Sequence, residues 1–121
     1  MKVKSLNWIS EDAEEAEVIV EDGCFECLVF SHPCNLSEGD TLNEPLHPLE
    51  IECVMKALSN QPKIEKLPKS YFAYKIVAKI INFNEAVVAI GGIIIDLGID
   101  IPSWAKDGDY IEFNCSRLDI W

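Results

Sequence analysis

The chain has 121 residues, 49% of them hydrophobic, with 21 acidic and 10 basic side chains and a net charge of −11. This length suits one hydrophobic core and is too short for two, so we expect a single domain over residues 1–121. No apolar run approaches the roughly 20 residues of a membrane-spanning helix, and residues 1–9 lack the apolar segment of a secretory signal. These absences and the odd number of cysteines predict a cytoplasmic protein with reduced thiols and no membrane association.

The charge is unevenly distributed along the chain. Residues 1–55 carry 13 acidic and 2 basic side chains, residues 56–79 carry 1 acidic side chain and 6 lysines, and residues 80–121 carry 7 acidic and 2 basic side chains. Negative charge attracts basic surfaces and repels phosphates over a Debye length of ~10 Å. The sequence therefore predicts a basic protein partner and argues against nucleic acid, with solubility alone as the competing explanation.

Residues 16–29 are predicted to form a β-hairpin. Asp22-Gly23 between two apolar runs is typical of a two-residue turn with positive φ at both central positions. Such a turn sets the register so that Glu21 pairs with Cys24. This register predicts one buried face and one mixed, partly solvated face. The side chains of the expected buried face are Ala16, Val18, Val20, Phe25, Cys27 and Val29.

Residues 49–57 alternate apolar and polar side chains with the period of a strand. A helix that begins at Pro48 is the competing interpretation, and the pattern leaves both open. Residues 60–70, which contain two prolines and three lysines, are predicted to be a loop. The strand interpretation places together Leu49, Ile51, Cys53, Met55 and Ala57.

Residues 72–81 alternate again and predict a strand, and residues 82–85 predict a reversal of the chain. Residues 86–95 are apolar on both faces, which predicts a central strand. Gly91-Gly92 inside this run indicates a bulge or a sharp bend. The inward side chains expected from the first of these strands are Phe72, Tyr74, Ile76, Ala78 and Ile80.

The C-terminal part is predicted to contain one helical turn over residues 101–105 and a final strand over residues 110–121. The apolar side chains change parity near Ser116-Arg117, which indicates a bulge there. An additional strand is expected over residues 3–9.

These elements predict an all-β fold with at most one short helix. We expect six to seven antiparallel strands in a small β-barrel or strongly curled sheet. Charged turns that contain Gly-Asp, at residues 37–42 and 106–111, resemble turns that lead into strands of OB-like and SH3-like barrels.

Three cysteines and a histidine within twelve residues suggest a zinc site, with Cys24, Cys27, His32 and Cys34 as ligands and His47 as a further candidate. A tetrahedral site needs four donors within about 2.3 Å of one metal. On an extended strand at ~3.3 Å per residue, Cys24 and His32 lie roughly 26 Å apart. We therefore predict no metal and no cofactor, and we interpret the cysteines as small buried side chains.

An exposed group of His32, Cys34 and His47 would instead suggest a cysteine-dependent enzyme, because a histidine can act as the base for a thiol nucleophile. The chain contains no glycine-rich phosphate cradle and no calcium-loop pattern. We predict that the protein is not an enzyme, and the cysteine-dependent reaction is our third hypothesis.

The lysine-rich middle of the chain also contains Tyr71, Phe72 and Tyr74. Small barrels bind single-stranded nucleic acid through such combinations of stacked aromatic rings and basic groups. Phe72 and Tyr74 share the parity expected of the core, however, while Lys75 and Lys79 point to the other side. A barrel that binds a small ligand or a single strand is therefore our second hypothesis.

The leading hypothesis is a non-enzymatic protein-binding domain with an acidic surface. Such a surface raises association rates with basic partners by roughly 10- to 10³-fold. In its size, acidity and lack of catalytic motifs, the chain is similar to bacterial immunity proteins, small cytoplasmic domains that bind and block a cognate toxin. This similarity implies a basic toxin or nuclease as the partner. The predicted partner-binding residues are Glu11, Asp12, Glu14, Glu15, Glu17, Glu21 and Glu26.

Overall fold

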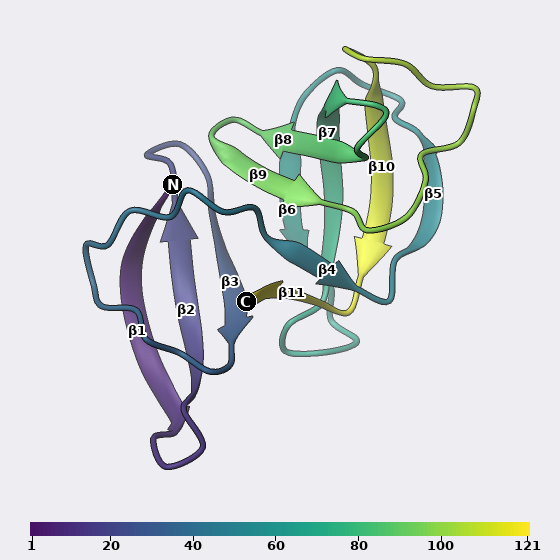
Figure 1. Ribbon diagram of the computed structural model, residues 1–121. Coiled ribbons are helices and arrows are strands. Elements are labelled where there is room, and N and C mark those ends of the chain that lie inside the picture. Colours follow the sequence, from purple (N-terminus) through teal and green to yellow (C-terminus); the bar gives the residue numbers. More distant parts are fainter.

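The structure, a computed structural model, describes residues 1–121 and contains eleven β-strands and no helix (Figure 1). It thus has no helix that could cross a membrane. The all-β prediction is confirmed, but the six to seven strands expected are too few. In chain order the strands are β1 (Lys2–Ser10), β2 (Glu15–Glu21), β3 (Glu26–Ser31), β4 (His47–Leu49), β5 (Glu52–Lys56), β6 (Lys63–Lys66), β7 (Tyr74–Asn82), β8 (Val87–Ile90), β9 (Ile93–Asp96), β10 (Tyr110–Cys115) and β11 (Arg117–Ile120).

The strands form two sheets that lie side by side in Figure 1. The first sheet has the order β1-β2-β3-β11-β4, in which β3 and β11 run parallel. The second has the order β5-β10-β7-β8-β9, with β6 pairing with β7. Leu46, the residue before β4 of the first sheet, forms an isolated bridge with Ile95 of β9 and so connects the two sheets. No closed barrel is found among these pairings, so the OB-like or SH3-like barrel is not confirmed.

One cluster of buried side chains lies between the two sheets. Strands β2, β3 and β10 bury alternate residues, as strands with one face toward a core do, and β7 does the same except that Val77 is also buried. The final strand is interrupted at Ser116, as the change of parity predicts, and both halves contribute to the cluster. Among the fully buried side chains are Val18, Val20, Val29, Leu46, Ile76, Ile111, Phe113 and Leu118.

The hairpin between β2 and β3 has a longer turn than predicted. Glu21 pairs with Glu26 rather than with Cys24, so residues 22–25 form a four-residue connection. The Asp22 carboxylate accepts hydrogen bonds from the backbone N–H groups of Cys24 and Phe25, at 2.8 and 2.7 Å, which stabilises this wider turn. Because the register shift is two residues, the predicted buried face of β2 and β3 is preserved.

Residues 86–95 form a hairpin rather than one central strand. β8 and β9 pair through Ile90 and Ile93, and Gly91-Gly92 is the turn between them. Gly91 has a φ of +59°, a left-handed conformation that glycine adopts without a steric penalty. The apolar run is therefore continuous because both arms of a tight hairpin are buried.

Residues 49–57 are extended, so the helix alternative is wrong, but they are divided between β4 and β5. Positive φ values at Glu50 and Cys53, 54° and 59°, interrupt the alternation of inward and outward side chains. Val54 therefore packs against the core, and Met55, which the alternation placed inward, is exposed.

Two further segments differ from the prediction. The expected loop over residues 60–70 contains β6, because Lys63–Lys66 pairs with β7. Residues 101–105 form a tight turn rather than a helical turn, closed by the hydrogen bond from the Ala105 N–H to the Pro102 carbonyl at 3.1 Å.

Candidate protein-binding face

The structure separates the seven predicted carboxylates into two groups. Glu11, Asp12 and Glu14 are exposed in the turn between β1 and β2, at the lower end of the first sheet in Figure 1. The remaining four lie on the outer side of β2 and β3, the side opposite the core. At ~3.3 Å per residue, the seven residues of β2 place the turn roughly 20 Å from the far end of the strand. We call the second group, Glu15, Glu17, Glu21 and Glu26, the acidic face.

Basic side chains of β1 lie next to the acidic face. Lys2 pairs with Glu21 across β1 and β2, and the Lys4 Nζ lies 2.7 Å from a carboxylate oxygen of Glu26. The hydrogen bond and charge of Glu26 raise the pKa of Lys4. These basic neighbours could not be predicted from the sequence. The register of β1 against β2 is set by bulges, and no turn motif specifies where they occur. The face is thus less negative than its carboxylates alone suggest.

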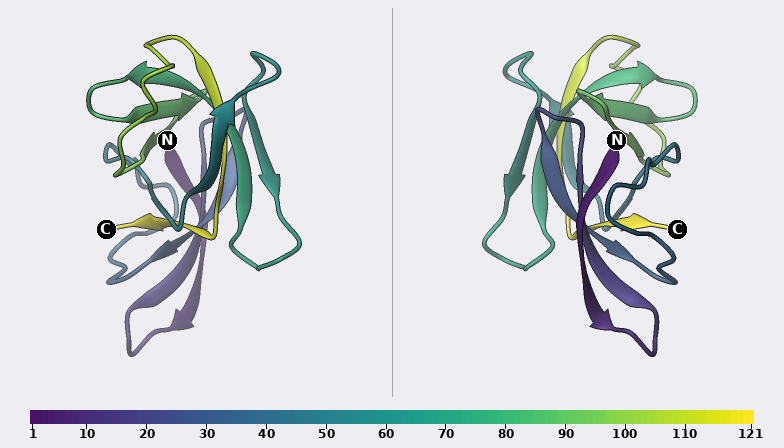
Figure 2. Two further views of the ribbon diagram at one scale, coloured as in Figure 1. Left: turned by 90° about the vertical axis from the view of Figure 1, so that its right-hand side faces the viewer. Right: turned by 90° about the vertical axis from the view of Figure 1, so that its left-hand side faces the viewer.

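A groove of about 440 Å³ runs along the outer side of the first sheet. Its aliphatic lining comes from three adjacent strands: Leu6 on β1, Ile19 on β2 and Leu28 on β3 are all partly buried. Glu17, Glu38 and the exposed Tyr71 also line the groove. Tyr71 belongs to the loop between β6 and β7, which extends beside the first sheet in Figure 2. We call this feature the outer groove.

Aromatic contacts hold the β6–β7 loop next to β3. The rings of Phe30 and Phe72 meet edge to face with centroids 6.2 Å apart, and those of Tyr71 and Phe72 do so at 5.1 Å. The Arg117 guanidinium lies 4.2 Å from the centroid of Phe30, and Asp119 accepts two hydrogen bonds from it, at 2.6 and 2.8 Å. These contacts fix Tyr71 at the edge of the outer groove.

The Glu17 carboxylate raises the pKa of Tyr71, because it interacts with the phenol hydroxyl. Glu17 also accepts a hydrogen bond from the Asn7 side chain at 3.3 Å. The outer groove therefore contains one carboxylate with neutral hydrogen-bonding neighbours and a second, Glu38, that has no ion pair within the chain. Glu38 was not predicted as a site residue, and Tyr71 was considered only for the hypothesis of single-strand binding.

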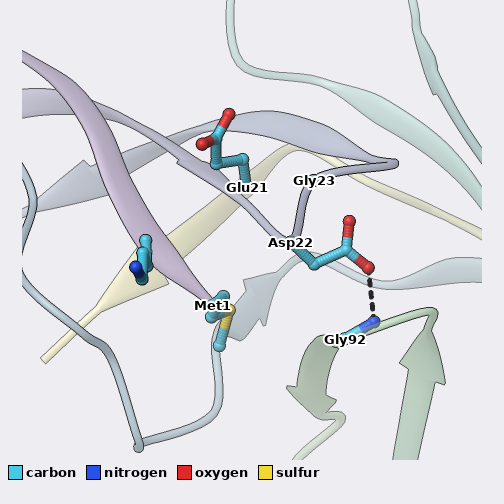
Figure 3. A pocket seen from close by; sticks show the side chains of 6 residues that line it. Met1, Glu21, Asp22, Gly23 and Gly92 are labelled. Carbon is cyan, nitrogen blue, oxygen red and sulfur yellow. Dashed lines mark hydrogen bonds between the residues drawn. The ribbon is translucent and has the colours of Figure 1, made fainter.

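A second pocket, of about 500 Å³, lies beside the β2–β3 turn (Figure 3). Met1, Lys2 and Glu21 line it, together with Asp22, whose carboxylate points to the turn between β8 and β9. There it accepts a hydrogen bond from the Gly92 N–H at 2.5 Å. Partial burial by itself would raise the pKa of Asp22, but the hydrogen bonds from Gly92 and from its own turn outweigh this effect and lower it. Because Asp22 already accepts three N–H groups, we interpret it as structural.

The cysteines and histidines do not form the metal site that their spacing suggests. Cys27 and Cys34 are buried, whereas Cys24 and His32 are exposed. The His47 ring stacks on the ring of the C-terminal tryptophan at 3.7 Å. No three His, Cys, Asp or Glu side chains are grouped in a way that could hold a metal ion.

Thiol reactivity should divide the cysteines into two classes. Burial raises the pKa of Cys27 to about 12 and that of Cys115 to about 11, so neither forms a reactive thiolate at neutral pH. We expect a thiol-specific chromogenic reagent to label Cys24 and Cys53 rapidly in the native protein, and the buried Cys27, Cys34 and Cys115 only after unfolding. A variant with serine at both exposed positions is the control, and rapid labelling of Cys34 in it would contradict the structure.

Comparison with known proteins assigns no family to this architecture. No protein-family model matches the chain, and neither the curated proteins nor the solved structures compared with it include a match.

Proposed function

We propose that the chain is a non-enzymatic domain that binds a basic protein through the acidic face of its first sheet. The observation that supports this proposal best is the position of Glu17, Glu21 and Glu26 on one side of two paired strands, beside an open groove with an aliphatic lining. Carboxylates gathered on one face steer a basic partner, and partly exposed apolar side chains next to them provide surface to bury on contact.

The class of protein that we propose is an immunity-type inhibitor that acts in the cytoplasm on a basic toxin or nuclease. The net charge of −11 supports this class, because such inhibitors must associate with their targets quickly. The three acids of the β1–β2 turn, Glu11, Asp12 and Glu14, would add to the steering field without contacting the same part of the partner.

A single-strand-binding or small-ligand domain remains the second proposal, because one basic group does lie with the aromatic rings. The Lys66 Nζ is 5.1 Å from the ring centroids of both Tyr71 and Tyr74. Three other lysines of this region are paired with acids: Lys63, Lys69 and Lys75. Binding of a single-stranded oligothymidylate at moderate salt would favour this alternative over a protein partner.

The experiment that tests the proposal is affinity capture from the cells that make the protein, at low and at high salt. The bait is the wild-type chain or a variant in which Glu17, Glu21 and Glu26 are changed to glutamine. We expect a basic protein to be retained at low salt by the wild type and to be reduced at least about tenfold with the variant.

A matched variant separates the acidic face from overall charge. Glu44, Glu85 and Asp100 are exposed acids outside the acidic face, and changing them to their amides alters the net charge by the same amount. This control should retain the partner at close to the wild-type level. Equal losses from both variants, or no basic protein retained at low salt, would refute the proposal.

A further inference from the structure

We infer that the outer groove receives a short extended segment of the partner in which a lysine or arginine and an aliphatic residue lie two positions apart. This inference rests on the proposed function and specifies the part of the chain that binds. The groove residues Leu6, Ile19 and Leu28 come from three adjacent strands and are only partly buried. Ile19 and Leu28 pair with each other across β2 and β3 and present an aliphatic surface on the solvent side of the first sheet, where strands usually carry polar side chains. Leu6 lines the groove but pairs with the fully buried Val18, so its side chain faces the core.

The charge of the outer groove defines the occupant. Its two ionisable groups other than the Tyr71 phenol are the carboxylates of Glu17 and Glu38, and no basic side chain lines it. Lys4 of β1 is paired with Glu26, and the Nζ of Lys66 lies over the rings of Tyr71 and Tyr74, 5.1 Å from each centroid, without lining the groove. A cationic side chain in the groove would therefore face two carboxylates that are not paired with a base of this chain.

The edges of the outer groove are fixed before any partner arrives. Glu38 lies in a turn held by the hydrogen bonds from the Ser37 N–H to Asp40 at 2.9 Å and from the Gly39 N–H to Val3 at 2.8 Å. Tyr71 is held by its ring contact with Phe72, which in turn packs against Phe30 of β3. Binding to such a preformed groove loses little conformational entropy in this chain.

The size of the outer groove also fits a short segment. Its volume of about 440 Å³ is in the range of preformed ligand pockets and accommodates a few side chains, not a folded domain. An extended segment presents every second side chain to one surface, so a basic and an aliphatic side chain two residues apart both face the groove, where one reaches a carboxylate and the other the aliphatic surface.

Three synthetic octapeptides test this inference by NMR titration of the ¹⁵N-labelled chain. Serine occupies every second position of all three peptides. The positions between alternate lysine with leucine in the first peptide, lysine with serine in the second, and glutamate with leucine in the third. We expect the lysine-leucine peptide to bind at least about tenfold tighter than either of the others. We also expect it to shift the amide resonances of Leu6, Ile19 and Leu28.

Two pairs of exposed residues supply matched variants. Tyr71→Ala and Glu38→Lys should each weaken the lysine-leucine peptide by about three- to tenfold, whereas Trp104→Ala and Glu85→Lys, outside the groove, should not. All four side chains are exposed, so these variants are expected to fold.

The outcomes distinguish the inference from the proposed function. Equal binding of the two lysine peptides, with shifts on the acidic face but none in the groove, would overturn the inference and leave the basic partner in place. Failure of both lysine peptides to bind better than the glutamate-leucine peptide would overturn both. Loss of binding in Trp104→Ala as large as in Tyr71→Ala would place the occupant elsewhere and also overturn the inference.

Discussion

The Asp22→Ala variant is expected to lose roughly 2–4 kcal/mol of unfolding free energy. The Asp22 carboxylate accepts hydrogen bonds from the N–H groups of Cys24, Phe25 and Gly92, at 2.8, 2.7 and 2.5 Å. Two of these shape the β2–β3 turn of the first sheet, and the third attaches that turn to the β8–β9 turn of the second sheet. Alanine therefore removes a connection between the sheets as well as a local turn.

Urea unfolding of the wild type and of Asp22→Ala at neutral and acidic pH measures this effect. The folded protein lowers the pKa of Asp22, so the carboxylate stabilises the fold above its unfolded pKa of about 3.9. This contribution is lost as the pH falls through the lower, folded pKa, and the difference between the two proteins should shrink there. Asp12→Ala, in an exposed turn, is the control. A difference under about 1 kcal/mol at neutral pH would contradict the structural role of Asp22.

The Gly91→Ala variant is expected to lose roughly 2–5 kcal/mol, for two physical reasons. Gly91 has a φ of +59°, which an L-residue with a Cβ rarely adopts. A Cβ at this position would also overlap an oxygen of Asp22 and lie 3.0 Å from the Phe25 ring. The β8–β9 turn would have to move away from the β2–β3 turn to accommodate it.

Gly98→Ala is the matched control for this second prediction. Gly98 has a φ of +71°, but a Cβ there would meet no atom within 4 Å, so only the backbone cost of about 1–2 kcal/mol applies. In the Asp22→Ala background, Gly91→Ala should cost at least about 1 kcal/mol less than in the wild type, because the overlapping carboxylate is gone. Thermal or urea unfolding of the wild type, Asp22→Ala, Gly91→Ala and the double variant gives the coupling free energy between the two positions. Equal costs for Gly91→Ala and Gly98→Ala would show that the two turns do not meet.

Much of the fold follows from local sequence patterns. Alternation of apolar side chains correctly identifies the buried faces of β2, β7 and β10, and the parity change at Ser116-Arg117 identifies the break before β11. The patterns that fail involve backbone conformations stabilised by distant groups. The Asp22 turn is four residues long, and its carboxylate also accepts the N–H of Gly92, seventy residues away. Patterns of neighbouring residues cannot identify that partner.

The candidate site was only partly predictable for the same reason. The strand period places Glu17 and Glu21 on one side of β2, and the preserved parity of the hairpin adds Glu26. Tyr71 and Glu38 reach the outer groove through loops whose positions depend on tertiary contacts, among them the Tyr71–Phe72 ring contact and the Gly39–Val3 hydrogen bond. Composition therefore indicates an acidic surface, whereas the groove depends on the folded chain.

The most direct test of a basic protein partner that binds the acidic face is the association rate constant of the captured partner, measured by stopped flow over a range of salt concentrations. The wild type should associate fast at low salt and lose rate steeply as salt rises. Changing Glu17, Glu21 and Glu26 to glutamine should lower the low-salt rate constant at least about tenfold and flatten its salt dependence. A rate constant independent of salt, or unchanged in this variant, would contradict the account.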